Sequence, residues 1–155
     1  MTPFSIIIVL SLVFLPFTSH AEDLDKGPLE LITAVEAAAP DLPSSESYFE
    51  ISREGDDGPI IELNAPQIGN PAKSPLTIDV TFLQNKGKDI DLSTFKAEYL
   101  KFITIDLTSR IKPYVTKDGI HTKDTKLPSG THTIRFTIGD KSGAITKRVF
   151  TVEVL

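Results

Sequence analysis

The stretch LPSGTHTIRFTIGDKSG, residues 127–143, decides the fold that the sequence predicts. At its centre His132, Ile134, Phe136 and Ile138 occupy alternate positions, with threonine or arginine between them. A period of two between inward and outward side chains indicates a half-buried β-strand. The glycine-containing segments on either side are typical of turns. The stretch therefore predicts one strand with a turn at each end, with His132 facing the core.

The same alternation recurs along the chain from residue 59 to the end. Loops rich in proline, glycine and polar residues separate the alternating runs, and DLTSRI predicts a short helical turn. About seven short strands without a βαβ pattern predict an all-β antiparallel sandwich rather than an α/β enzyme. The other runs that we interpret as strands are PIIELN, SPLTIDVTFLQ, STFKAEYL, YVT, GIHT and ITKRVFTVEVL.

The last third of the chain resembles bacterial immunoglobulin-like domains. In that family a Leu-x-x-Gly turn leads into a strand that carries Tyr or His two residues after the glycine. Leu127, Gly130 and His132 match this spacing, and a polar hairpin at Asp140 precedes the closing strand. The resemblance covers residues 59–155 and implies an immunoglobulin-like β-sandwich of about seven strands. It also implies a structural corner, where the imidazole bonds back to the backbone, but it implies no particular activity.

The first twenty-one residues are typical of a signal peptide. The run FSIIIVLSLVFLPF is almost wholly apolar, and Ser19 and Ala21 provide small residues before an acidic segment. We expect cleavage between Ala21 and Glu22, which predicts a periplasmic or secreted protein with no stable membrane insertion afterwards. An uncleaved membrane anchor is the alternative. However, the run is shorter than the about 20 residues that a spanning helix needs, and Pro16 interrupts it.

The charge of the remaining chain is divided unevenly. Residues 22–58 carry a net charge of −9, whereas residues 59–155 carry +4. We call the acidic segment the arm. It either docks on the basic domain or keeps the protein soluble. The domain is not basic enough to predict nucleic-acid binding.

Within the arm, GPLELITAVEAAAP predicts a short helix over residues 29–39, with a proline at each end. Helical spacing would place Leu31, Ile32 and Val35 on one face. The arm's polar, acidic composition leaves disorder as the alternative.

The sequence predicts no catalytic residue, no cofactor and no metal site. It contains no cysteine, and its only methionine is the first residue. Once the leader is removed, His121 and His132 are the only histidines, which is too few for a zinc motif. Ser129 lies near His132 but not in a Gly-x-Ser-x-Gly elbow. Aspartates in GDDG, KDID and DKSG leave a calcium ion open, although none has the spacing of a calcium loop.

These observations predict a non-enzymatic binding or accessory module of the bacterial cell envelope. A cysteine-free exported chain fits a bacterial source better than a small animal secreted domain. An unknown protein partner would bind its loops or add a strand to a sheet edge. A carbohydrate-binding accessory domain, with a glycan as the partner, is the alternative. The chain has no tryptophan, and Tyr114 is its only plausible exposed aromatic platform.

Overall fold

The structure, a computed structural model, describes residues 27–42 and 57–155. The expected cleavage site at Ala21 and Glu22 lies outside these residues. Within the described residues, seven strands and three short helical segments follow one another. In order they are α1 (Ala34–Ala37), β1 (Ile60–Ala65), β2 (Leu76–Leu83), β3 (Ile90–Tyr99), β4 (Ile105–Asp106), α3 (Thr108–Ile111), the 3-10 turn η1 (Lys112–Tyr114), β5 (Gly119–Thr125), β6 (Gly130–Asp140) and β7 (Ile145–Val154).

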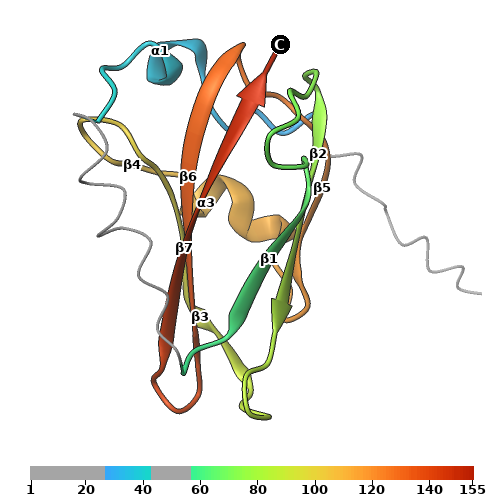
Figure 1. Cartoon of the computed structure of the whole chain (residues 1–155), viewed down its shortest axis with the longest axis vertical. Helices are drawn as coiled ribbons and strands as arrows, with labels where there is room; N and C mark the ends of the chain where they lie inside the picture. Colours follow the sequence, from blue (N-terminus) through green and yellow to red (C-terminus); the bar gives the residue numbers. More distant parts are fainter. Residues whose placement is uncertain (1–26, 43–56) are drawn as a thin grey trace, which may run out of the picture.

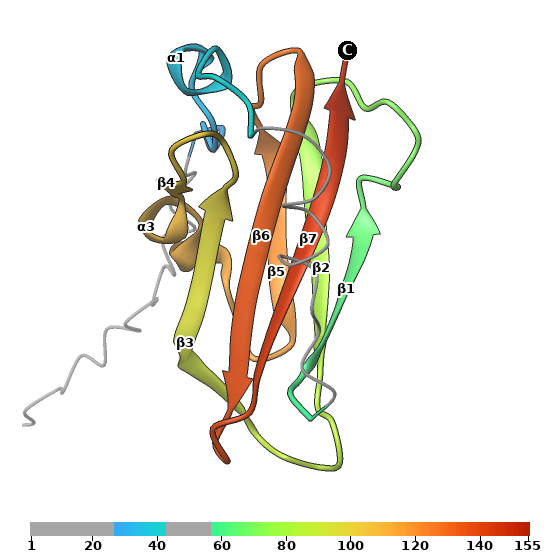
Figure 2. The same cartoon turned by 60° about the vertical axis from the view of Figure 1, so that its left-hand side comes forward.

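The strands form two antiparallel sheets that face each other in a sandwich-like arrangement (Figures 1 and 2). One sheet has the order β1-β2-β5 and the other has the order β4-β3-β6-β7. The longest ladder joins β6 to β7 and runs without interruption from Gly130–Val154 to Gly139–Ile145. The predicted all-β class and the two-sheet antiparallel arrangement are therefore confirmed.

The core lies between the sheets because alternate side chains of each strand point inward. Four phenylalanine rings cross it in a chain: Phe82 lies 6.1 Å from Phe95, which lies 6.3 Å from Phe136, which lies 6.0 Å from Phe150. These centroid distances are within the range for favourable aromatic pairs. The chain of rings joins one strand of the three-stranded sheet to three strands of the other.

The arm is less helical than its sequence predicts. Within residues 29–39 the helix is limited to Ala34–Ala37. Thr33 caps its first turn, and Glu36 bonds back to Thr33 in a capping box. The residues before Thr33 are extended, and Glu30 forms a parallel bridge with Lys126. The prediction of a helix over residues 29–39 is therefore wrong at its N-terminal half.

The predicted apolar face of the arm is also wrong in part. Leu31 and Ile32 are buried, but Val35 is 83% exposed. Leu31 and Ile32 are both buried because they lie in the extended segment that enters the core. Val35 instead lies on the solvent side of α1.

Side chains on the outer face of β6 are less exposed than simple alternation predicts. Thr133 and Thr137 are buried, and the Arg135 side chain is only 21% exposed. β6 is an inner strand with neighbours on both sides, so the flanking side chains cover it. Arg135 lies against Glu98 of β3, with 2.9 Å between Nη2 and Oε2. It is therefore ion-paired rather than a free outward charge.

Further segments of the chain cover two sheet edges. The Glu30–Lys126 bridge extends the edge just after β5, and Ala72 forms a second parallel bridge with Val154 at the end of β7. Covering an edge in this way satisfies backbone groups that would otherwise pair with another chain. Among the residues that the structure describes, no helix is long and apolar enough to cross a membrane.

Candidate functional site

A polar hollow lies beside α1, at the end of the sandwich opposite the β6–β7 hairpin (Figure 1). The end of β3 and the start of β6 supply most of its lining. The chemically distinctive side chains here are Tyr99, Lys101 and His132, with Asp41 contributed by the arm. This hollow is the candidate site because it collects a phenol, an ammonium, an imidazole and a carboxylate.

His132 is buried and uses both of its ring nitrogens. Its Nε2 lies 2.8 Å from the carbonyl oxygen of Pro128, and its Nδ1 lies 3.0 Å from the hydroxyl of Tyr99. A carbonyl only accepts, so Nε2 carries the proton. Burial lowers the pKa of His132, and the nearby Lys101 charge adds to this effect against the opposing Pro128 bond. The ring is therefore neutral at pH 7, and Tyr99 donates to Nδ1.

Lys101 is the second buried group of the site. Its side chain is 5% exposed and bonds to Asp41, whose own side chain is 80% exposed. Burial disfavours the ammonium, but its bonds to Asp41 and Tyr99 and their charges outweigh that cost and raise the pKa of Lys101. The ammonium also lies 5.3 Å from the centre of the Tyr99 ring. The pKa of Tyr99 is raised in turn, chiefly by burial.

Each of these bonds has a defined direction. Lys101 donates to Asp41, whereas Tyr99 donates to His132 and His132 donates to Pro128. Each group has its proton in a defined place, so the arrangement holds three parts of the chain together. The imidazole has no free nitrogen with which to accept a proton from the exposed Ser129 nearby. The arrangement can thus fix geometry, and it lacks the pairing of nucleophile and base that acyl transfer needs.

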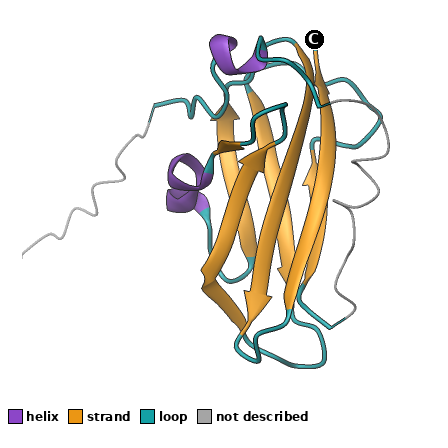
Figure 3. Cartoon of the chain, turned by 90° about the vertical axis from the view of Figure 1, so that its left-hand side faces the viewer, coloured by secondary structure: helices purple, strands orange, loops and turns teal. Residues whose placement is uncertain are grey.

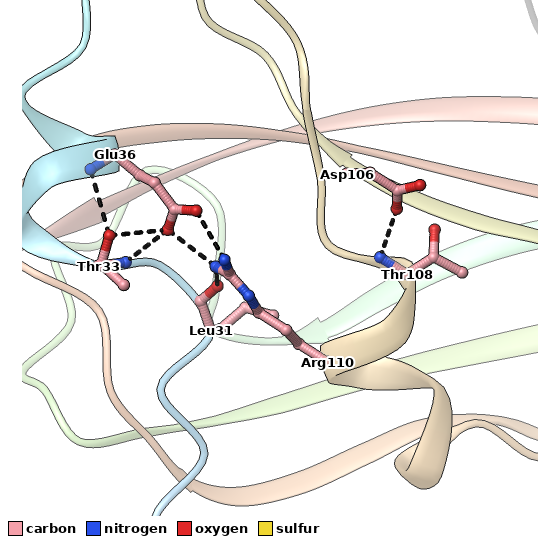
Figure 4. A network of polar contacts seen from close by, with 6 residues as sticks. All are labelled: Leu31, Thr33, Glu36, Asp106, Thr108 and Arg110. Carbon is pink, nitrogen blue, oxygen red and sulfur yellow. Dashed lines mark hydrogen bonds and ion pairs between the residues drawn. The ribbon is translucent and has the colours of Figure 1, made fainter.

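A second ionic contact of the arm, made through two hydrogen bonds, lies near this hollow (Figure 4). The guanidinium of Arg110 in α3 binds both carboxylate oxygens of Glu36, at 2.7 and 2.8 Å, and donates to the carbonyl of Leu31 at 2.9 Å. Asp106 accepts from the backbone of Thr108 at 2.7 Å, at the start of α3. The bond from Arg110 lowers the pKa of Glu36 from 4.5 to about 2, helped by the Thr33 bonds against the cost of burial.

Three of the loop aspartates that could suggest calcium have protein partners, and Asp56 lies outside the described residues. Asp57 pairs with Lys86, Asp89 lies 3.6 Å from Lys141, and Asp140 accepts from the backbone and hydroxyl of Ser142. Residues 27–42 and 57–155 contain no cluster of three or more metal-ligating side chains. His121 is half exposed and lies 3.2 Å from Asp79 on the neighbouring strand, well separated in sequence and sheet from His132.

Two of the three predicted corner residues, Gly130 and His132, line the hollow, whereas Leu127 lies in the core. Leu127 is buried and donates its backbone N–H to Ser74, while Gly130 begins β6 with φ of +129°. Few residues other than glycine adopt that backbone conformation. No local pattern pairs Tyr99 with His132, because 33 residues separate them along the chain.

Comparison with known proteins adds little to this geometry. No protein-family profile matches the chain, and no curated protein matches it. The chain is similar to the crystal structure of an engineered protein from the Northeast Structural Genomics Consortium, with 15% identity and a TM-score of 0.41. The match covers 63% of this chain and 20% of that one.

Proposed function

We propose that this chain is an immunoglobulin-like domain, exported by a bacterium, that acts as a non-enzymatic binding or accessory module of the cell envelope. The strand order supports the fold part of the proposal. As in constant-type immunoglobulin domains, the first, second and fifth strands share one sheet and the third, sixth and seventh share the other. The fourth strand differs: here β4 lies beside β3, whereas constant-type domains place it in the sheet of the first two strands. The buried imidazole bonded to the backbone before β6 is consistent with the corner of such domains.

The observation that carries the non-enzymatic role is the engagement of both the imidazole and the ammonium in the hollow. His132 has both nitrogens bonded, and the ammonium of Lys101 is held by Asp41. Catalysis at this site would require a group that is free to take up a proton or attack a substrate. A scaffold role uses the same bonds without that requirement.

The surface that we propose for partner binding is the turn between β3 and β4. Phe102 and Ile103 are 66% and 75% exposed in this turn, next to the arm. Adjacent exposed apolar side chains of this size favour a contact surface over a solvated loop. A carbohydrate-binding accessory role is the alternative, for which half-buried Tyr114 is a poorer platform.

A photoreactive residue at position 102, introduced in cells with an intact envelope, tests this role. We expect specific protein adducts, identified by mass spectrometry, and no adducts from the same residue at position 142 in the exposed hairpin at the other end. Equal adducts from both positions would refute the proposed surface. Binding on a glycan array without protein adducts would favour the carbohydrate alternative.

Export is tested separately by sequencing the N-terminus of the protein recovered from cells. Cleavage after Ala21 predicts that the protein begins at Glu22. An intact leader in the membrane fraction would instead support the anchor.

A further inference from the structure

Residues 29–41 of the arm lie against the domain as a bound peptide would, and we call the surface that they contact the groove. It pairs through its backbone with the chain beyond β5, where Leu31 N donates to Lys126 at 3.2 Å and Lys126 N donates to Leu29 at 2.7 Å. Leu31 and Ile32 are 0% and 1% exposed. This is the usual mode of strand addition, in which backbone bonds give affinity and apolar side chains fill pockets.

Charged contacts then fix the position of the arm in the groove. The carboxylate of Glu36 meets Arg110, and that of Asp41 meets Lys101. Farther along, the backbone of Phe102 donates to the carbonyl of Pro40 at 2.9 Å. The domain therefore recognises two adjacent apolar residues followed by two acidic residues. This pattern is present in the arm of every copy of the chain.

In the sequence, residues 42–56 connect this part of the arm to the domain, and we call them the connection. Asp41 lies beside Lys101 just after β3, whereas Asp57 lies beside Lys86 just before β3. The ten residues of β3 separate these points by about 30 Å at roughly 3.3 Å per residue. Figure 3 likewise shows α1 and the start of β1 at opposite ends of the sandwich. The sixteen residue steps from Asp41 to Asp57 can extend over about 55 Å.

We infer that the arm is exchangeable, and that the groove also accepts the arm of a second copy, which forms a reciprocal dimer. The exchanged contacts would be the same as those within one chain, which is why swapping an identical element is a low-cost route to a dimer. The surplus length of the connection lets an arm leave its own groove and reach another. This inference does not depend on the proposed binding role.

Concentration sets how much exchange occurs. Short tethers give effective concentrations on the order of 1 mM, and the value falls as a tether lengthens, so about 1 mM is an upper bound for this connection. Arms should thus remain mostly in their own grooves at micromolar concentration. When the chain is refolded at about 1 mM, we expect roughly half of the arms or more to occupy the other copy.

Disulfide trapping tests the exchange directly, because the native chain has no cysteine. Glu30 and Lys126 are exposed and paired across the bridge, and neighbouring strands are about 4.8 Å apart, within disulfide range. One chain carries Glu30→Cys and a second, of different mass, carries Lys126→Cys. The matched control mixes chains carrying Thr131→Cys and Glu153→Cys, which are exposed partners on β6 and β7.

Both mixtures are made from whole chains, co-refolded near 1 mM and oxidised. We expect a disulfide heterodimer from the Glu30 and Lys126 variants and only a background amount from the control. Equal yields in the two mixtures would overturn the inference. Equal yields would leave the proposed partner surface at Phe102 unaffected.

Shortening the connection gives an independent test. Deleting residues 45–54 leaves six steps between Asp41 and Asp57, about 20 Å at full extension, which cannot span the length of β3. We expect this chain to be a dimer at concentrations where the native chain is a monomer, as measured by sedimentation. A same-length replacement of residues 45–54 by glycine and serine should remain monomeric. A shortened chain that stays monomeric and folded would contradict arm exchange.

Discussion

Two polar contacts at the same end of the molecule differ in charge and in the parts that they join. The chain from Tyr99 through His132 to Pro128 is neutral, buried and internal to the sandwich. The pair between Glu36 and Arg110 is ionic, partly exposed and joins the arm to the domain. The neutral contact carries no net charge for salt to screen, whereas the ionic contact is screened by salt and is lost as Glu36 is protonated, when the pH falls from about 4.5 towards 2. The comparison indicates a permanent internal brace beside an attachment that conditions can weaken.

The largest loss of stability should come from changes in the apolar part of the arm. Leu31→Ala removes a fully buried side chain and should reduce the free energy of unfolding by about 2–5 kcal/mol. Val35→Ala, at a position that is 83% exposed, should change it by less than about 0.5 kcal/mol. Urea denaturation of both variants measures the difference. Similar small effects would mean that the arm is not part of the core in solution.

The neutral chain should come next in size. Tyr99→Phe leaves Nδ1 of His132 without its donor, and His132→Phe leaves the Tyr99 hydroxyl and the Pro128 carbonyl unpaired. Each change should cost about 1–3 kcal/mol because an unsatisfied buried polar group is expensive. The double variant should cost less than the sum, since the two side chains share one hydrogen bond. Strict additivity in urea denaturation would show that they do not interact.

The ionic contact should give a smaller effect with a distinct dependence on pH. The pKa of Glu36 is lowered from 4.5 to about 2, so the carboxylate stabilises the folded chain above pH 4.5. That contribution is lost as the pH falls from about 4.5 towards 2. Glu36→Gln should therefore reduce stability by about 1 kcal/mol at pH 7 and flatten the stability profile in that window.

Glu62→Gln on β1 is the control for the dependence of stability on pH, because Glu62 is exposed and lies in a strand that does not contain either partner of the ion pair. Thermal unfolding at several pH values provides the measurement. If the Glu36 and Glu62 variants gave the same profile, the ion pair would contribute nothing measurable to the attachment of the arm.

The smallest effect should come from Asp41→Asn. The Asp41 side chain is 80% exposed, so water can replace much of what it offers to Lys101. We expect a loss below about 1 kcal/mol, which added salt should reduce further by screening. A loss as large as that of Leu31→Ala would show that the acidic groups, rather than the apolar ones, hold the arm.

The strands were predictable because their signal is local. Phe95, Ala97 and Tyr99 are buried in β3, as the alternation in STFKAEYL predicts. The helix of the arm was harder, since its first half is held extended by Lys126, which is distant in sequence. Propensity and spacing within GPLELITAVEAAAP carry no information about that partner.

The polar contacts were the least predictable part of the molecule. Glu36 and Arg110 are 74 residues apart, and the only trace of their pairing in the sequence is the division into an acidic arm and a basic domain. That division indicated a possible contact but not which side chains make it. The burial of Lys101 had no local signal either, because a lysine after a strand is typical of an exposed turn.

The bridge between Glu30 and Lys126 has a consequence for how the molecule is made. The ribosome produces Glu30 first and Lys126 ninety-six residues later. At about 5–20 residues per second, roughly 5–20 s pass between the synthesis of Glu30 and that of its partner Lys126. Leu31 and Ile32 are exposed to water or to chaperones throughout that interval. The first-made part of the described chain therefore cannot take its place until five of the seven described strands have been synthesised.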